Sequence, residues 1–141
     1  MFNTILQATQ NFIQHQIREE FVLSTQTMNE QNIITYIDIN TKDTLYRVYA
    51  IYNSEFAQKI SFVFLEEEES DEETLQDMAL ESTNLIVGSA KVLAQDNDSI
   101  AFEIQTPHLQ NDDTPLSNVQ HTQTISIEDA QITLTLEELN G

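Results

Sequence analysis

The sequence contains no cysteine and no tryptophan, and its 141 residues include only two prolines and two glycines. Without cysteine the chain has no disulfide, no thiol nucleophile and no cysteine metal ligand, which suits a reducing compartment. The two glycines are Gly88 and Gly141, so neither a glycine-rich phosphate loop nor the G-x-S-x-G turn of serine hydrolases is present. These absences argue against nucleotide binding and against a hydrolase triad.

Basic residues are also scarce, since five Lys and Arg stand against 24 Asp and Glu and give a formal charge of −19. This charge repels the phosphates of nucleic acids and the head groups of anionic lipids, so we expect neither as a partner. No apolar run is long enough to cross a bilayer, and the N-terminus lacks the basic region and apolar block of a secretory signal. We therefore expect a cytoplasmic protein without membrane insertion.

The pattern of apolar residues predicts one α+β domain over residues 1–141, with a mostly antiparallel sheet and long helices packed on it. The N-terminal helix has a polar face of glutamine rather than lysine, which favours packing on a sheet over a membrane surface. Ser54 is the expected cap of the second helix. The predicted helices are Met1 to about Glu19, a short helix from Ser54, and about Glu73 to Gln95; the predicted strands are Phe21–Ser24, Asn32–Asn40, Thr44–Tyr52, Ser99–Thr106, His121–Ile127 and Gln131–Leu136, with a loop from Pro107 to Gln120.

An acidic run from Glu66 to Glu73 precedes the longest predicted helix. Carboxylates are the ligands that calcium prefers, but the run lacks the alternating ligands, the turn glycine and the distal glutamate of an EF-hand loop. A solvated linker whose negative charge favours the N-terminus of the next helix explains the run more simply. We assign no metal site to it.

Four residues of the longest helix form one narrow stripe. At about 100° per residue, Asp77, Glu81, Asn84 and Gly88 fall within about 60° of each other around the helix axis. The predicted core face is centred about 110° away, which leaves the stripe open to solvent or a partner. Leu80 and Val87 flank the stripe and are either partner contacts or the margin of the core. The predicted members of the core face are Leu75, Met78, Ala79, Ser82, Leu85, Ile86, Ser89, Val92 and Leu93.

The stripe belongs to a longer pattern, D-x3-E-x2-N-x22-P, formed by Asp77, Glu81, Asn84 and Pro107. This pattern resembles the signature of the CheC/CheX/FliY group of chemotaxis phosphatases. Residues 84–91, N-L-I-V-G-S-A-K, look like the corresponding N-x-I-x-G-N-A-K segment of CheX-like proteins, with Ser89 where asparagine is usual. The N-terminal helix has no second Glu-x-x-Asn, so the resemblance is closest to the CheX proteins, which carry one site.

The resemblance implies a phosphatase that removes the aspartyl phosphate of a CheY-like response regulator. In this interpretation Glu81 docks on the receiver and Asn84 orients the attacking water, because one amide both donates and accepts hydrogen bonds. Asp77, Leu80, Val87 and Gly88 are expected partner contacts. Pro107 is expected to position the adjoining strand and helix.

The same resemblance implies a homodimer and no cofactor of the protein's own, with Mg²⁺ held by the receiver. The alternative is a receiver-binding module without catalysis, as in the related flagellar switch proteins. Taken singly, each residue of the pattern has an ordinary explanation as an exposed helix residue or a strand terminator. It is their combination on one stripe that favours a site.

The three histidines offer a weaker alternative. His15 precedes Glu19 by four residues and His108 precedes Asp112 by four, but each pair supplies only two metal ligands, and His121 has no such neighbour. We interpret all three as surface or helix-face residues rather than metal ligands or catalytic bases.

Overall fold

A computed structural model describes residues 1–24, 32–110 and 119–139. The helices are α1 (Phe2–Phe12), which continues as the π-helical turn η1 (Ile13–Ile17), α2 (Ser54–Leu65) and α3 (Glu72–Asp98). The strands are β1 (Val22–Ser24), β2 (Asn32–Asn40), β3 (Leu45–Asn53), β4 (Glu103–Ile104), β5 (His108–Leu109), β6 (Val119–Ile127) and β7 (Ala130–Glu138).

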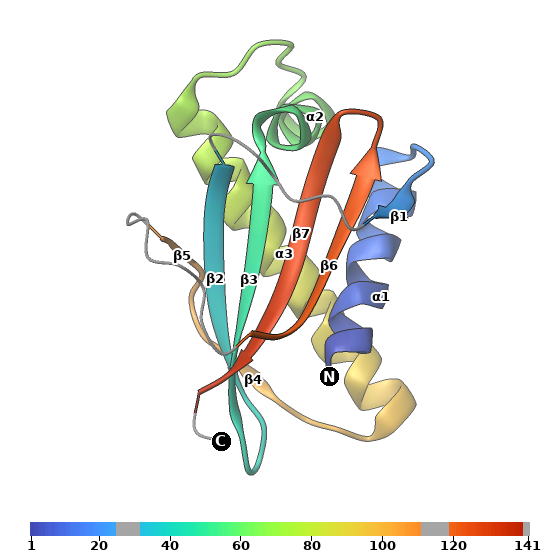
Figure 1. The fold of residues 1–141 in the computed structure, drawn as a ribbon, viewed down its shortest axis with the longest axis vertical. Coiled ribbons are helices and arrows are strands. Elements are labelled where there is room, and N and C mark those ends of the chain that lie inside the picture. The colour runs from blue at the N-terminus through green and yellow to red at the C-terminus, as the bar shows by residue number, and fades with distance from the viewer. Residues whose placement is uncertain (25–31, 111–118, 140–141) are drawn as a thin grey trace.

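The strands form one sheet in the order β1-β6-β7-β3-β2-β4, with β5 also pairing with β2 (Figure 1). Every pairing between these strands is antiparallel. Two hairpins, β2–β3 and β6–β7, supply the long strands, and β3 and β7 join them at the centre of the sheet. The predicted α+β class with a mostly antiparallel sheet is therefore confirmed.

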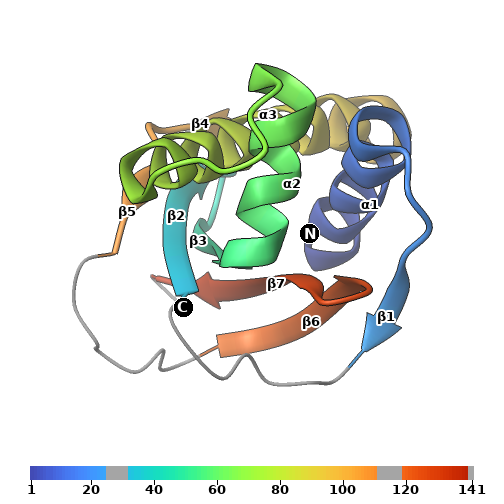
Figure 2. The same cartoon turned by 90° about the horizontal axis from the view of Figure 1, so that it is seen from above.

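The three helices cover one face of this sheet (Figure 2). The core lies between the two layers, where Ile5 of α1, Phe56 of α2 and Ile86 of α3 are buried. Alternate residues of the strands supply the other half, and Ile37, Val48 and Leu134 are buried there. In the described ranges no helix combines the length and apolar character that a membrane span requires.

The cap of α2 is Asn53 rather than the predicted Ser54. The Asn53 side chain accepts a hydrogen bond from the Phe56 backbone N–H at 2.9 Å, and its oxygen also accepts one from the Gln131 N–H at 2.9 Å. Its Nδ2 donates to the Asp129 carbonyl at 2.8 Å. Asn53 is the better cap because it binds the helix N-terminus and the β6–β7 turn together.

The strand predicted over Ser99–Thr106 is largely absent. Only Glu103 and Ile104 form β4, whereas Ile100 is exposed and Phe102 is buried without belonging to a strand. α3 extends to Asp98, so the chain first has to return from the helix end to the sheet. The predicted loop from Pro107 is likewise interrupted by β5, and β6 begins at Val119; residues 111–118 lie outside the described ranges.

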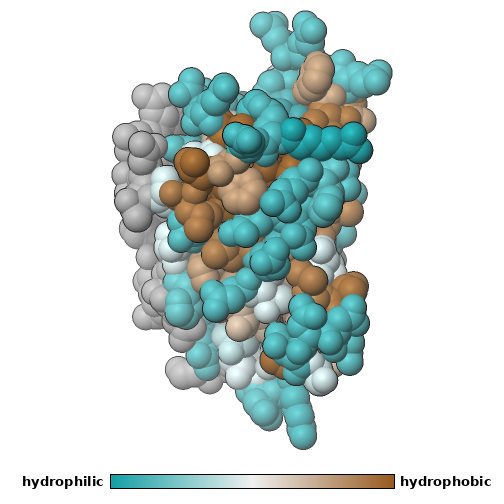
Figure 3. All heavy atoms as spheres, turned by 90° about the vertical axis from the view of Figure 1, so that its right-hand side faces the viewer, coloured by the Kyte–Doolittle hydropathy of each residue, from teal (hydrophilic) through white to brown (hydrophobic). Residues whose placement is uncertain are grey.

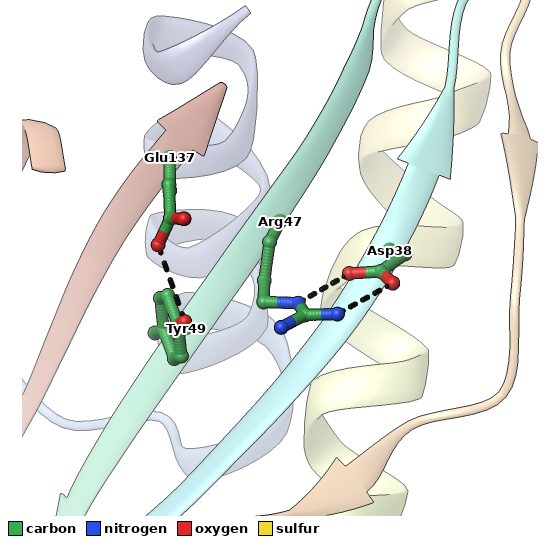
Figure 4. A network of polar contacts seen from close by, with 4 residues as sticks. All are labelled: Asp38, Arg47, Tyr49 and Glu137. Atoms are coloured by element: carbon green, nitrogen blue, oxygen red, sulfur yellow. Dashed lines mark hydrogen bonds and ion pairs between the residues drawn. The ribbon is translucent and has the colours of Figure 1, made fainter. Parts of the chain in front are cut away.

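The face of the sheet opposite the helices carries a polar network (Figure 4). Arg47 of β3 donates to both carboxylate oxygens of Asp38 on β2, at 2.7 and 3.0 Å. The guanidinium also lies 4.4 Å from the centre of the Tyr36 ring. One strand further, the Tyr49 hydroxyl donates to Glu137 of β7 at 3.2 Å. These contacts join three neighbouring strands side by side and fix their register.

Candidate functional site

The site is built on α3, whose start is set by the acidic run. The Asp71 carboxylate accepts a hydrogen bond from the Thr74 backbone N–H at 2.8 Å and caps the helix. Hydrogen bonds from Thr74 lower the pKa of Asp71 from its usual value. Glu72 and Glu73 follow in the first turn, where negative charge interacts favourably with the helix dipole. The linker interpretation of the run agrees with this geometry.

A cluster of buried hydroxyls fixes the rotation of α3 over the sheet. Thr83 Oγ1 lies 2.6 Å from Thr35 Oγ1 of β2 and 2.8 Å from the Tyr52 hydroxyl of β3. Within the helix, Thr83 also donates to the Ala79 carbonyl at 2.8 Å. Burial raises the pKa of the Tyr52 hydroxyl, which therefore stays protonated and available for hydrogen bonding. Thr83 thus points directly at the sheet.

This rotation turns the predicted stripe outward. Asp77, Glu81 and Asn84 are exposed, and Gly88 is partly exposed. Among the described residues, neither the Glu81 carboxylate nor the Asn84 amide has a hydrogen bond or an ion pair. Their Cβ atoms lie about 5–6 Å apart, as in any i, i+3 pair on a helix. The structure therefore presents a carboxylate and an amide together on an open surface.

The predicted core face of α3 is partly wrong. Its observed members centre about 180° from the stripe rather than about 110°. Leu85, Ser89 and Val92, which were assigned to the core, are exposed. The prediction followed the larger apolar side chains, whereas smaller ones let the helix lie close to the sheet. The buried residues of α3 are Met78, Ala79, Ser82, Thr83, Ile86, Val87, Ala90 and Ala94.

The same rotation separates the two residues that were expected to flank the stripe. Val87 is 1% exposed and belongs to the core, so its prediction as a partner contact is wrong. Leu80 is partly buried and lies at the margin. Leu85, at 42% exposure, and Val92, at 59%, are the most exposed large apolar side chains of α3. Helical spacing alone did not reveal this, because both residues also fit a core face.

Pro107 lies between two short strands that pair with the same neighbour. Ile104 of β4 pairs with Ile39, and His108 of β5 pairs with Tyr36. Residues 105–107 therefore lie opposite only two residues of β2, which makes a one-residue bulge. Proline suits this position because it has no N–H for the ladder. Both strands contact α3, so Pro107 helps to shape the sheet edge beside the site helix.

Solved structures resemble this arrangement over nearly the whole chain. The CheX chemotaxis protein of Vibrio vulnificus matches with a TM-score of 0.80 and 16% identity, covering 97% of this chain and 95% of that one. A CheX–CheY–BeF₃–Mg²⁺ complex from Borrelia burgdorferi matches with a TM-score of 0.68 and 14% identity, covering 97% of each chain. The chain has the CheX-like fold.

The middle domain of FliM from Vibrio alginolyticus also matches this fold, with a TM-score of 0.57 and 7% identity. That match covers 97% of this chain and 90% of the FliM domain. No protein-family model and no curated protein matches the sequence. At these identities the comparisons establish the fold, which agrees with the fold that the motif implied.

The three histidines are less suited than the α3 stripe to catalysis or to metal binding. Lys59 pairs with Glu19 at 2.8 Å, so Glu19 is engaged away from His15. His121 stacks on Phe2 with ring centres 5.2 Å apart, and His108 lies against Tyr36 at 5.4 Å. The residues with described structure contain no cluster of three or more side chains suited to a metal ion.

A groove beside α2 has a volume of about 620 Å³. Its walls are mostly apolar, and the charged groups at its rim include Lys59 and Glu19, which neutralise each other. Neither Glu81 nor Asn84 lines it. The groove therefore lacks the converging, unpaired polar groups of a catalytic pocket, and the α3 stripe is the stronger candidate.

Proposed function

We propose that this protein is a chemotaxis phosphatase that removes the aspartyl phosphate of a CheY-like receiver domain. The observation that carries the proposal is the pair Glu81 and Asn84, exposed and unpaired on the outermost face of α3. The relative from Borrelia burgdorferi, which has the same fold, is known in complex with CheY. An exposed helix face that carries a carboxylate and an amide can contact a partner's active site, whereas an enclosed pocket could not.

In this mechanism Asn84 holds the attacking water. Its carbonyl oxygen accepts a hydrogen bond from the water while its NH₂ group donates to the phosphoryl oxygens, which places the water in line with phosphorus. An amide is a poor nucleophile, so it orients the water without forming a covalent intermediate. Positioning of this kind supplies most of the catalysis in phosphoryl transfer.

Glu81 supplies docking in the same mechanism. Its carboxylate lies one turn before Asn84 and pairs with a lysine of the receiver's active site, which fixes α3 against the phosphorylation site. Asp77, one further turn toward the N-terminus, contacts the rim. The receiver contributes Mg²⁺, because one carboxylate and one amide on α3 are too few ligands for a dedicated cage. Chelation should therefore stop dephosphorylation, although calorimetry should detect no specific Mg²⁺ binding to this chain alone.

The test is phosphate release from a phosphorylated CheY-type receiver of the same organism. Wild-type protein should accelerate release, whereas Asn84→Ala should lose at least about a hundredfold of that acceleration because an orienting group has been removed. Glu81→Ala should lose affinity as well as rate. Asn97→Ala is the matched control, since Asn97 is exposed on the last turns of α3, away from the stripe.

The experiment also separates the two candidate functions. The likeness to the FliM middle domain favours, as the second candidate, a module that binds the receiver without hydrolysis. Binding of the phosphorylated receiver with an unchanged phosphate lifetime would select that module. If Asn84→Ala accelerated release as well as wild type does, the role proposed for its amide would be wrong.

We further propose that two copies associate along the β1 edge of the sheet. β1 is a short edge strand, and its Val22 and Leu23 are 63% and 52% exposed. Figure 3, which faces this side of the molecule, shows apolar side chains gathered among hydrophilic ones. Unpaired edges with apolar side chains favour strand addition. Light scattering should give a dimer mass for the wild type and a monomer mass for Leu23→Lys; a monomeric wild type would contradict the proposal.

A further inference from the structure

Gly88 occupies a position where none of the residues that the structure describes requires glycine. It lies in the middle of α3, where glycine lowers the folding equilibrium constant about fivefold relative to alanine. Its φ is not positive, so the backbone conformation is open to any residue. An added Cβ would meet no heavy atom within 4 Å beyond its chain neighbours and the helix backbone. Neither local conformation nor internal packing explains the glycine.

The surroundings of Gly88 form a notch on the outer surface of α3. The residues three and four positions away on a helix surround any given position, and here these are Asn84, Leu85, Lys91 and Val92. Leu85 and Val92 are the two large apolar side chains of the helix that are substantially exposed. Asn84 borders the notch on its N-terminal side. The missing side chain therefore leaves a hollow that is apolar along one wall and adjoins the proposed water-orienting amide.

We propose that Gly88 is the point of closest approach between α3 and the receiver, and that an apolar side chain of the receiver enters the notch between Leu85 and Val92. This inference rests on the proposed function and adds the contact that sets the depth of docking. Glycine is used where another backbone or a ligand must come close. No part of the described chain does so at Gly88, and in this proposal the approaching group belongs to the receiver.

The depth of docking matters because Asn84 has to reach a water beside phosphorus. Displacement of a positioning group by about 1 Å can cost about a hundredfold in rate. A methyl group at position 88 would hold the helix away from the receiver and withdraw Asn84 by a comparable amount. Gly88 is thus a positioning residue, which acts through the placement of Asn84 rather than on the phosphate.

The test is the variant Gly88→Ala, because it separates stability from docking. It should raise Tm by about 3 °C through better helix propensity. At the same time its affinity for a CheY-type receiver loaded with beryllofluoride and Mg²⁺, which mimics the phosphorylated form, should fall about tenfold or more. Phosphate release should slow in parallel. Asn97→Ala is the matched control: Asn97 is exposed on the same helix, nine positions from Gly88 and away from Leu85 and Val92, so its replacement should leave the affinity unchanged.

Each other outcome has a definite meaning. If Gly88→Ala is more stable and binds the receiver as tightly as wild type, the inference is overturned while the proposed function stands. A less stable Gly88→Ala would show that the glycine serves the fold, and would overturn the inference too. If Gly88→Ala disrupts self-association but not receiver binding, the notch is a contact between copies of this chain. A wild-type protein that neither binds the receiver nor speeds phosphate release would overturn both proposals.

Discussion

Thr83→Val should destabilise the protein, because it leaves a buried hydroxyl without a partner. Among the described residues, Thr83 is the hydrogen-bond partner of the Tyr52 hydroxyl, and Tyr52 is fully buried. Valine has nearly the same shape and a similar helix propensity, so neither a cavity nor a helix penalty contributes. An unsatisfied buried hydroxyl costs about 2 kcal/mol. For 141 residues this loss corresponds to a fall of about 7 °C in Tm.

A double-mutant cycle measured by urea unfolding tests the reasoning. Tyr52→Phe alone should cost about 1 kcal/mol, since Thr83 keeps its contacts with Ala79 and Thr35. The double variant removes the orphaned hydroxyl, so it should be more stable than the sum of the single effects predicts, by about 1 kcal/mol. Strictly additive effects, or a Thr83→Val variant as stable as wild type, would refute the cluster as the anchor of α3.

Two further outcomes follow from the same packing. Burial raises the pKa of Tyr52, so the folded state favours its neutral hydroxyl. The contribution of this group to the free energy of unfolding is therefore fully present below the unfolded pKa of about 10, and it is lost as the pH rises above that value. Circular dichroism should show a smaller alkaline loss of stability in Tyr52→Phe than in wild type, and equal losses would contradict this assignment. Asn53→Ala should lower the free energy of unfolding by about 2 kcal/mol in a denaturant titration, because the side chain caps α2 and holds the β6–β7 turn. A loss below about 0.5 kcal/mol, which is typical of surface substitutions, would exclude that role.

Periodicity predicted the regular elements of this fold well. The range of β2, Asn32–Asn40, was predicted as observed, and β3 was placed within one residue, because alternating apolar side chains mark a strand with one buried face. The order of strands in the sheet was not predicted from periodicity. It depends on contacts such as Arg47 with Asp38 and Tyr49 with Glu137, which join residues far apart in the sequence or on different strands.

The segment after α3 was the least predictable part. Ile100, Phe102 and Ile104 alternate as a strand would, yet only Ile104 pairs with a neighbour. The chain leaves α3 through Ser99, which has a left-handed conformation, and it must cross from the helix layer to the sheet before it can pair. Alternation records which side chains are apolar, but it carries no information about whether a partner strand lies alongside.

The rotation of α3 explains why the stripe is exposed as predicted and why part of the predicted core face is wrong. The motif placed Asp77, Glu81 and Asn84 on one stripe, and that spacing holds for any rotation of the helix. Which side of the helix meets the sheet depends instead on Thr83, whose hydroxyl contacts Thr35 and Tyr52 from two different strands. A threonine within a helix gives little signal of this in sequence, and larger residues such as Leu85 dominated the predicted core face.

The corrected rotation strengthens the argument for a surface that serves a partner. With the core face about 180° from the stripe, Glu81 and Asn84 lie on the line of α3 farthest from the sheet. A helix that buries its small residues also leaves larger apolar ones outside, and here Leu85 and Val92 lie beside the proposed catalytic pair. Such exposed apolar side chains have no use within the described chain. Their position suits the contacts that the proposed docking of a receiver on α3 requires.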